Sequence, residues 1–419
     1  MKDVDLYQQL LGLGGPWKVQ DVALDLKRHS VVVRVRCDPG QVWSCPKCTH
    51  RATIHDWTER VWRHLDTCQM RTQIEARVPR VRCTHEECPE RGTITVQVPW
   101  AEGSSRFSAQ FECFAIRLLN ECSLSGAAEI LRISWDEVDG IMDRAVKRGR
   151  KRKAAAPGTV TRVCIDEKSA GRGHDYVTVV AALHSDGAAT VEHVADGREE
   201  ASLNSYWQSR TPAQLAALEG VGMDMWRPYF NSTMNLVPRA EEIITFDRFH
   251  IMQKVTMALN EVRRAEQAAG AQQLKGTRME WLTSEENLTP DAREHVMKLC
   301  SKCRTTGRAY AMKEALRQFW SCQGAAEGKA FLRWWTGWAQ RCRMPPMARV
   351  GEMLKRHAGG LLAWFNTRLS NGAIEGINNK IQSLVKRAYG FRNKERLKTA
   401  IYFHCGGLNL YPETSGGAQ

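Results

Sequence analysis

The chain has 419 residues, enough for about two to four domains, and its 43% hydrophobic content is that of a globular protein with a sizeable core. Its 60 Lys and Arg outnumber its 46 Asp and Glu, and the net charge of +14, spread along the chain, indicates nucleic acid as the partner. There is neither an apolar run near the roughly eighteen residues of a membrane span nor an N-terminal signal peptide, so we expect a cytoplasmic, nucleoid-associated protein with no membrane partner.

The first 100 residues predict an N-terminal β module. Residues 22–37 alternate polar and apolar side chains like a hairpin, and 70–78 and 93–99 read as further short strands. No long helix fits the segment 37–99. The short turns between these strands carry paired cysteines, which suggests that the module also binds a metal.

Two pairs of cysteines, Cys45 with Cys48 and Cys83 with Cys88, predict a structural zinc site in this module. Disulfides are rare in the cytoplasm, and four thiolates from two short turns can surround Zn²⁺ tetrahedrally. Three nearby histidines could each replace a thiolate: His50, His55 and His85. The other cysteines, with the weaker pair Cys300 and Cys303 among them, are interpreted as core or surface thiols.

Residues 101–150 change to a helical period and predict a helix-turn-helix DNA-binding domain. Three amphipathic runs begin near residues 105, 123 and 134, and the last two meet at a short turn, 132–134. Ser134 and Glu137 form a capping box at the start of the third run, which would read the major groove of DNA. Acids on this run are unfavourable beside phosphates, so a plain three-helix bundle remains the alternative.

A strongly basic segment follows the third run. Six of the seven residues 147–153 are Lys or Arg, and Pro157 with Gly158 would break a helix. Residues 151–158 are therefore expected to be a basic linker that binds backbone phosphates. The expected DNA-binding side chains of the segment are Lys147, Arg148, Arg150, Lys151, Arg152 and Lys153.

Residues 159–250 predict a mixed α/β unit. Its apolar runs follow the order strand, strand, strand, helix, strand, helix, strand, which is the order of an RNase H-like core. The strands are expected at 159–166, 175–184, 189–195, 219–225 and 241–250. Almost all of 251–370 has helical character, so the whole chain is interpreted as a multidomain α+β protein.

Three carboxylates are the candidate catalytic residues. Asp166 and Asp224 end the first and fourth expected strands, which are neighbours in an RNase H-like sheet, and Glu375 lies in an Asn-rich helical run. Phosphoryl transfer on DNA uses two divalent cations, and hard Mg²⁺ prefers carboxylate oxygens. We predict that the three acids hold two Mg²⁺ ions, for which Mn²⁺ can substitute. Basic side chains that follow Glu375 are expected to hold DNA phosphates: Lys380, Lys386, Arg387 and Arg392.

Asp247 competes with Asp224 for the second metal-binding position. It closes the fifth expected strand, one element later than the fold requires, so the strand count favours Asp224. Asp247 and His250 would then pair and brace the site from behind its metal ligands. A buried structural role for His250 is an equally fair interpretation.

These residues resemble the DDE transposases of the ISL3 insertion-sequence family, of the IS204/IS1001/IS1096/IS1165 type. The similarity covers nearly the whole chain and is carried by short blocks at 165–168, 173–176, 223–225, 247–250, 371–378 and 387–391. The resemblance implies an RNase H-like catalytic core interrupted by an all-α insertion at 251–368 and completed by 369–419. It also implies action on terminal inverted repeats and, because two element ends must be brought together, a homodimer.

The sequence therefore predicts a transposase that binds the terminal inverted repeats of its element and catalyses Mg²⁺-dependent DNA cleavage and strand transfer. The alternatives are a zinc-containing DNA-binding regulator with an inactive core, and a nuclease without joining activity. One aromatic patch, Trp334, Trp335 and Trp338, matches nothing in the resemblance. It is interpreted as buried core, with stacking on a DNA base as the other possibility.

Overall fold

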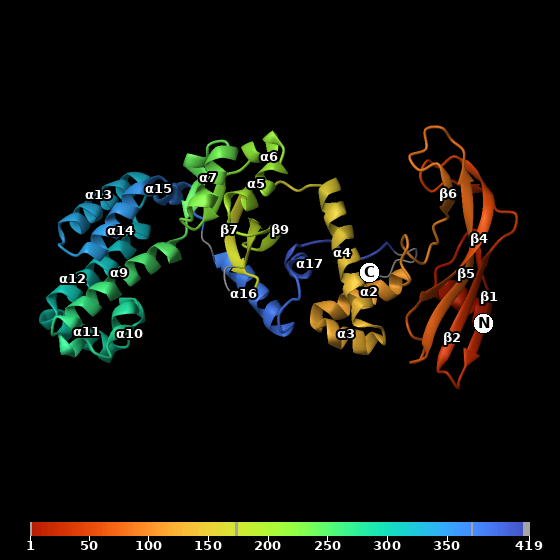
Figure 1. Ribbon diagram of the computed structural model, residues 1–419, viewed down its shortest axis with the longest axis horizontal. Helices are drawn as coiled ribbons and strands as arrows, with labels where there is room; N and C mark the ends of the chain where they lie inside the picture. Colours follow the sequence, from red (N-terminus) through yellow and green to blue (C-terminus); the bar gives the residue numbers. More distant parts are fainter. Residues whose placement is uncertain (1, 172–174, 370–371, 414–419) are drawn as a thin grey trace. The chain divides into compact units, whose positions relative to one another are not determined.

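The computed structural model describes residues 2–171, 175–369 and 372–413 (Figure 1). The chain forms two compact units, Met1–Pro157 with Leu408–Gln419, and Gly158–Gly407. No helix in the described ranges is both long and apolar enough to cross a membrane. Three residues of the family-like blocks lie outside the described residues: Gly173, His174 and Asn371.

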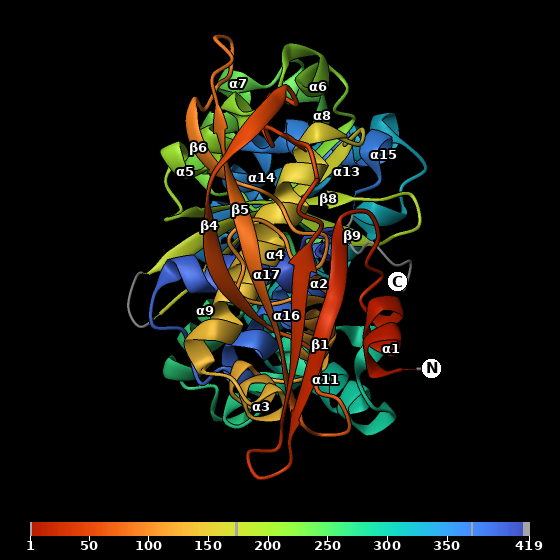
Figure 2. The ribbon, with the colours of Figure 1, turned by 90° about the vertical axis from the view of Figure 1, so that its right-hand side faces the viewer.

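A six-stranded β-sheet dominates the first unit. The helix before it and its strands are α1 (Asp3–Leu10), β1 (Trp17–Asp25), β2 (Ser30–Cys37), β3 (Trp43–Ser44), β4 (Arg51–Arg63), β5 (Arg71–Cys83) and β6 (Gly92–Thr95). The strand order is β1-β2-β5-β4-β3, with β6 beside β5, and Figure 2 shows the long β4 and β5 next to each other. The expected hairpin is confirmed by the antiparallel pair β1 and β2, whereas α1 and β4 were not predicted from the sequence.

The period of two in the sequence explains why these strands form a sheet with one buried face. In β2, Val31, Val33 and Val35 are buried, while the intervening Arg34 and Arg36 are exposed. Successive side chains of a strand point to opposite faces, so the valines enter the core and the arginines meet solvent.

Three helices follow the sheet: α2 (Ala109–Glu121), α3 (Leu124–Leu131) and α4 (Trp135–Ala155). Each begins after a serine whose hydroxyl oxygen accepts a backbone N–H of the first turn: Ser108, Ser123 and Ser134. The predicted capping box of Ser134 and Glu137 is present. Arg132 adopts the left-handed conformation, with φ of 55°, and ends α3 three residues before α4 begins. The predicted helix-turn-helix is therefore confirmed.

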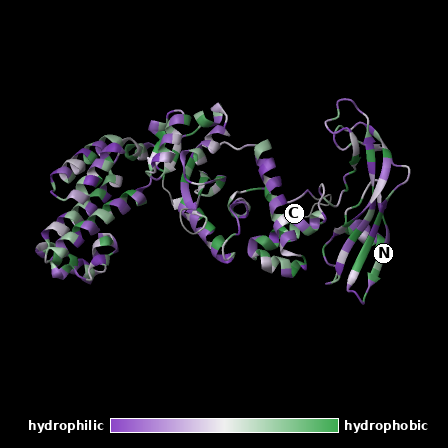
Figure 3. Cartoon of the chain, in the orientation of Figure 1, coloured by the Kyte–Doolittle hydropathy of each residue, from purple (hydrophilic) through white to green (hydrophobic). Residues whose placement is uncertain are grey.

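The basic segment is mostly helix, and the expected linker at 151–158 is wrong in its first part because α4 continues to Ala155. Lys and Arg are good helix formers, and near a helix C-terminus they also interact favourably with the helix dipole. No strong helix breaker precedes Pro157. Figure 3 shows that most residues of α4 are hydrophilic.

The C-terminal segment 408–413 packs in the first unit. The guanidinium of Arg148 donates to the carbonyl oxygen of Leu410 at 2.6 Å, and Arg152 donates to that of Tyr411 at 2.5 Å. Gly149 lies so close to Leu408 that a Cβ on the glycine would be 2.7 Å from the Leu408 Cβ. The expected assignment of all of 369–419 to the catalytic core therefore needs correction after residue 407.

A five-stranded sheet forms the centre of the second unit. Its strands are β7 (Arg162–Ser169), β8 (Tyr176–Leu183), β9 (Ala189–Asp196), β10 (Gly220–Met223) and β11 (Ile244–Phe246). Their order is β11-β10-β7-β8-β9; β7, β10 and β11 run parallel, while β8 and β9 pair antiparallel. The first and fourth strands of the unit are neighbours, as predicted.

Two predicted boundaries differ from the structure. β7 does not end at Asp166 but continues to Ser169. The expected strand 241–250 is a short helix α8 (Ala240–Ile243), the strand β11 and the start of α9, because the side chain of Asp247 caps that helix. The remaining helices of this part are α5 (Glu200–Gln208), α6 (Pro212–Ala216) and α7 (Arg227–Leu236).

Every described element between β11 and residue 369 is helical. The α-helices are α9 (Arg248–Ala268), α10 (Arg278–Leu282), α11 (Pro290–Lys302), α12 (Arg304–Arg317), α13 (Ala325–Arg341), α14 (Pro345–Arg356) and α15 (Ala358–Thr367). Trp335 on α13 is fully buried, whereas the side chain of Trp334 is 52% exposed. Two last helices, α16 (Gly372–Arg387) and α17 (Lys394–Cys405), return to the sheet and contact β9, and α16 also contacts β7.

Candidate functional site

Asp166 lies on β7, and Asp224 directly follows the neighbouring parallel strand β10. Cys164 of β7 pairs with Gly222 of β10, and each aspartate comes two residues later in the chain. Parallel strands keep their register, so both aspartates stand at the same level of the sheet. The strand pairing thus places the two predicted acids at the same edge of the sheet.

Asp247 stands at this level too, directly after the next strand, β11. Met223 of β10 pairs with Phe246 of β11, so Asp247 is the neighbour of Asp224, and its N–H donates to the carbonyl of Met223 at 3.0 Å. His250 lies between the two acids: Nδ1 is 3.7 Å from Asp224 Oδ2, and Nε2 is 3.7 Å from Asp247 Oδ2. This arrangement fits the expected bracing role of Asp247 and His250.

Asp166 is held by its own strand and by α16. Its Oδ1 accepts the backbone N–H of Glu167 at 2.8 Å, and its Oδ2 accepts Nδ2 of Asn378 at 2.5 Å. Burial raises the pKa of the Asp166 carboxyl and nearby Asp224 adds to the rise, while these two hydrogen bonds and His250 oppose it. A cation would favour the ionised form of this carboxyl.

Asn378 was not singled out in the sequence analysis, although the Asn-rich character of its segment was a signal. Its Oδ1 is buried, and among the described residues it has no hydrogen-bond partner. A buried amide oxygen beside a carboxylate is a hard donor of the kind that Mg²⁺ accepts. The observed side chains therefore fit a divalent cation at Asp166.

Glu375 lies on α16 one helical turn before Asn378. The buried face of this helix is made by Ile374, Ile377 and Ile381, and Glu375 itself is exposed. Residues three apart on a helix are neighbours, with Cβ atoms about 5–6 Å apart, so α16 brings Glu375 to the vicinity of Asp166. A metal site needs ligand atoms close together. In the described residues, the oxygens of Asp166, Asp224 and Glu375 do not form a group whose atoms all lie within 4.8 Å of one another.

Glu167 follows Asp166 on β7, so its side chain lies on the opposite face of the sheet. It was not named as a candidate site residue from the sequence. Burial raises its pKa, and the charges of Asp166 and Asp224 add to this effect. Its carboxylate is 3.8 Å from Arg198, whose guanidinium lies over the rings of Tyr176 (4.4 Å) and Trp226 (4.7 Å). This cation offsets part of the negative charge at the carboxyl edge of the sheet.

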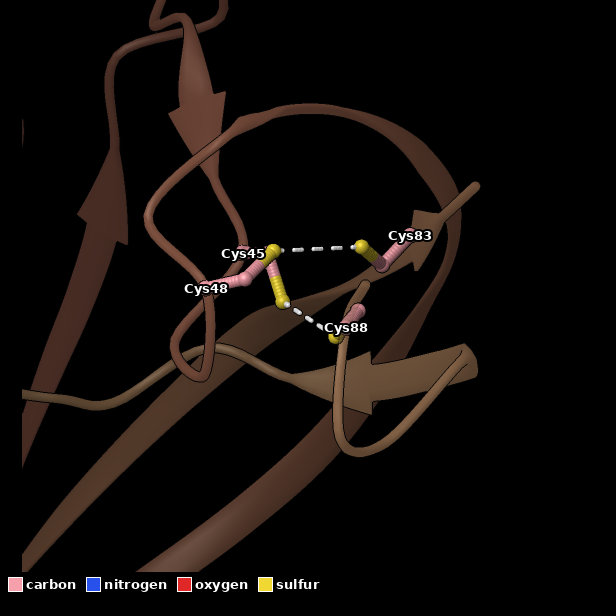
Figure 4. Close-up of side chains that lie close together, drawn as sticks. All are labelled: Cys45, Cys48, Cys83 and Cys88. Carbon is pink, nitrogen blue, oxygen red and sulfur yellow. Dashed lines mark hydrogen bonds between the residues drawn. The ribbon is translucent and has the colours of Figure 1, made fainter. Parts of the chain in front are cut away.

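The four predicted zinc ligands converge in the first unit (Figure 4). The sulfurs of Cys45, Cys48, Cys83 and Cys88 all lie within 4.8 Å of one another, with Sγ distances of 3.8 Å for Cys45–Cys88 and 3.5 Å for Cys48–Cys83. Burial would raise the pKa of the Cys45 thiol, but the backbone N–H groups of Cys48 and Lys47 lower it to about 7. Four thiols placed this closely match a closed structural zinc site.

The three histidines named as alternative ligands separate into two groups. His50 and His85 stack on each other beside Cys48. The ring of His55 faces Asp56 at 3.3 Å and belongs to none of the close ligand groups in the described ranges.

The basic side chains of α4 divide into structural and exposed ones. Arg148 pairs with Glu102 at 2.6 Å and with buried Glu112 at 2.9 Å, and its side chain is only 11% exposed. The expected DNA contact of Arg148 is therefore not supported, because its charge is already used inside the fold. Lys147 is 75% exposed and pairs with Asp143 of the preceding turn. On and after α16, Lys380, Lys386, Arg387 and Arg392 are all exposed.

Three family models match successive parts of the chain. Residues 41–88 match the zinc-finger of transposase IS204/IS1001/IS1096/IS1165, and 96–146 match the helix-turn-helix domain of transposase family ISL3. Residues 163–401, more than half of the chain, match the ISL3 model described as "Transposase".

Two curated relatives extend the similarity to almost the full length. The transposase for insertion sequence element IS1557 of Mycobacterium tuberculosis is 29% identical over 430 aligned positions, which cover 95% of this chain and 94% of the relative. The transposase for insertion sequence element IS1001 of Bordetella parapertussis is 24% identical over 364 positions, 85% of this chain and 87% of the relative. The matches bear out the predicted family, zinc module and helix-turn-helix.

Proposed function

The chain belongs to the ISL3 family of transposases, and from this premise we propose that it binds the terminal inverted repeats of its own insertion sequence and cuts and joins DNA there by a two-metal DDE mechanism. The observation that carries this proposal is the row of Asp166 on β7, Asp224 directly after β10 and Asp247 directly after β11, at one level of three adjacent parallel strands. The strand order of the second unit supports an RNase H-like core, and α9 to α15 would be the all-α insertion before its last helices.

In this proposal Asp166, Asp224 and Glu375 hold two Mg²⁺ ions, or Mn²⁺ in their place, and Asn378 adds an amide oxygen. Two such ions would supply charge stabilisation to the attacking and leaving oxygens of an in-line displacement. Water attacks a phosphorus at the element end and the P–O3′ bond breaks, which leaves a 3′-hydroxyl on the element and a 5′-phosphate on the flanking strand. The 3′-hydroxyl then attacks a target phosphorus in line, and the target's own 3′-oxygen leaves as a hydroxyl while the new P–O bond joins element to target. Asp247 and His250 keep Asp224 in place.

The first unit would select the DNA. The helix-turn-helix presents α4 to the major groove, and the zinc module keeps its strands and turns fixed beside it. Exposed cations, with half-buried Lys153, would hold phosphates in both units: Lys147, Arg150, Lys151, Lys153, Lys380, Lys386, Arg387 and Arg392. A homodimer would bring the two element ends together.

The test is cleavage and joining of a labelled duplex that carries the inverted repeat found in the DNA flanking the gene. Asp166→Asn should abolish both reactions in Mg²⁺ and leave binding of the duplex intact. Asp224→Asn should do the same, while Asp247→Asn should only slow cleavage. Asp186→Asn is the matched control, since this aspartate caps an exposed turn of the same sheet with a hydrogen bond to the Ala188 N–H. Normal cleavage by Asp166→Asn would refute the proposed site.

One observation favours the alternative of a zinc-containing DNA-binding regulator with an inactive core. Asp166, Asp224 and Glu375 do not form one of the close ligand groups found in the described ranges. The regulator would bind the repeat with the same affinity but release no product with Mg²⁺ or Mn²⁺. A nuclease without joining activity would release cut ends and give no strand-transfer product.

A further inference from the structure

The turn after α16 holds an aromatic residue in an unusual backbone conformation. Tyr389 has a φ of 51°, in the left-handed region where a Cβ is crowded and glycine is favoured. Its N–H donates to the carbonyl of Lys386 at 3.1 Å, and the N–H of Gly390 donates to the carbonyl of Val385 at 2.9 Å. These two bonds make a Schellman motif with Tyr389 at the position that is usually glycine. The tyrosine therefore carries a backbone cost that glycine would not.

The ring of Tyr389 gains nothing from the fold that would offset this cost. The residue is fully exposed, at 101%, whereas each of the other seven tyrosines is 38% exposed or less. Within the described ranges, its side chain has neither a ring contact nor a polar partner. A strained residue that packs against nothing in its own chain points to a partner outside it.

The surroundings of the ring match a nucleic acid. Three exposed cations lie close to it in the chain: Lys386, Arg387 and Arg392. A DNA strand presents phosphates to such cations and flat bases to an aromatic ring, and stacking on a base tolerates any sequence. The turn joins α16 to α17, so a helix fixes each of its ends (Figure 1).

We propose that Tyr389 is a wedge that enters the base stack of the DNA close to the cleaved bond. The proposal rests on the proposed transposase function and gives Tyr389 a positioning role, since its ring would touch bases and not the reacting atoms. An aromatic ring inserted at a base step partly unstacks it and kinks the duplex, and the ring replaces part of the lost stacking. The cations on either side would hold the phosphates of the same stretch.

The helix sets how far from the cleaved bond the wedge would act. Asn378 of α16 binds Asp166, and Tyr389 comes eleven residues later in the chain. A rise of about 1.5 Å per residue places Tyr389 about 16 Å further along the helix axis. Because nucleotides follow one another at about 3.4 Å along a strand, this distance corresponds to about five nucleotides at most.

Photo-crosslinking locates the contact directly. Thymines of the inverted-repeat duplex are replaced one at a time by 5-iodouracil, the full-length protein is bound and irradiated, and the crosslinked peptide is identified by mass spectrometry. We expect Tyr389 to crosslink within about five nucleotides of the cleaved bond. Crosslinks that fall only on other residues would overturn the proposal. This readout needs binding alone, so it decides the role of Tyr389 even if the wild-type protein fails to cut and the proposed reaction is lost.

Two substitutions separate the ring from the backbone. Tyr389→Gly removes the wedge and relieves the strained φ, so its melting temperature should equal or exceed that of the wild type. Its single-turnover cleavage should nevertheless be slower on the order of tenfold, since one base loses its stacking partner. Tyr389→Phe keeps the ring and should restore the rate.

Arg343→Gly is the matched control. It makes the same backbone change at another exposed residue of the second unit, where φ is 57°, and should cleave at the wild-type rate. Wild-type cleavage by Tyr389→Gly would overturn the proposal. A lower melting temperature of Tyr389→Gly would also overturn it, because the ring would then be part of the fold.

Discussion

Glu112 is the charged centre that holds the helix-turn-helix together, and its removal gives a quantitative prediction. The side chain on α2 is 2% exposed, and two arginines of α4 bind it: Arg144 donates to Oε1 at 2.7 Å and Arg148 to Oε2 at 2.9 Å. Ser105 donates a further hydrogen bond to Oε1 at 2.8 Å. In Glu112→Gln the charge is lost while the size is kept.

The expected magnitude follows from burial. Breaking a buried ion pair leaves its partner charge uncompensated and costs about 3–5 kcal/mol. Arg144 is 35% exposed and can turn to water. Arg148 is 11% exposed but keeps its ion pair with Glu102 and its hydrogen bond to the Leu410 carbonyl, so we expect the lower end, about 3 kcal/mol. Since about 1.4 kcal/mol is a tenfold change in an equilibrium constant, amide protection in α2 and α4 should fall on the order of a hundredfold.

Hydrogen exchange of peptides from α2 and α4 measures this change without requiring the whole chain to unfold in one step. Asp143→Asn is the control, because it removes an ion pair with Lys147 on the same helix that is largely exposed and worth about 0.3–0.5 kcal/mol. Equal loss of protection in the two variants would show that the buried cluster does not hold α2 to α4. Weaker binding of the inverted repeat should accompany the loss in Glu112→Gln, since α4 is the proposed reading helix.

Three further predictions concern a hydrogen bond, a pH dependence and the zinc site. Asn378→Ala should slow cleavage by about 10–100-fold, the usual effect of losing a group that positions a metal ligand, while its exposed neighbour Asn379→Ala should not. Burial lowers the pKa of His64 from 6.5 to about 4. Between these pH values the unfolded chain binds a proton that the folded chain excludes, so the stability of the first unit should fall as the pH drops from 6.5 towards 4. The expected loss is at most about 3 kcal/mol. His64→Gln should flatten that slope in a pH series of denaturation curves. Chelating zinc should expose Cys83 to an alkylating reagent, detected by peptide mass spectrometry, and leave buried Cys164 of the other unit protected.

A different result would contradict each of these three predictions. Equal rates for the Asn378 and Asn379 variants would remove Asn378 from the site. A pH slope that persists unchanged in His64→Gln would assign the titration to another group. Alkylation of Cys83 before zinc is removed would show that the four thiols are not closed around a metal.

The sequence already contained the features that depend on neighbouring residues. The spacing of Cys45, Cys48, Cys83 and Cys88 predicted the zinc site because two short turns suffice to present four thiols. Ser134 and Glu137 predicted the start of α4 because a helix cap is a local arrangement. The strand order also predicted that the first and fourth strands of the core are neighbours, and the family was recognisable from short blocks.

Features that depend on distant residues came only from the fold. Nothing near Arg148 in the sequence indicates that its guanidinium pairs with Glu102 and Glu112 and donates to the Leu410 carbonyl. A basic run alone suggests exposed side chains. Asn378 binds Asp166 only because α16 returns to β7 after the long helical segment. Local hydrogen bonding and periodicity determine where helices, strands and knuckles form, whereas packing between elements far apart in the chain determines which charges are buried, which remain free for DNA, and which carboxylates meet.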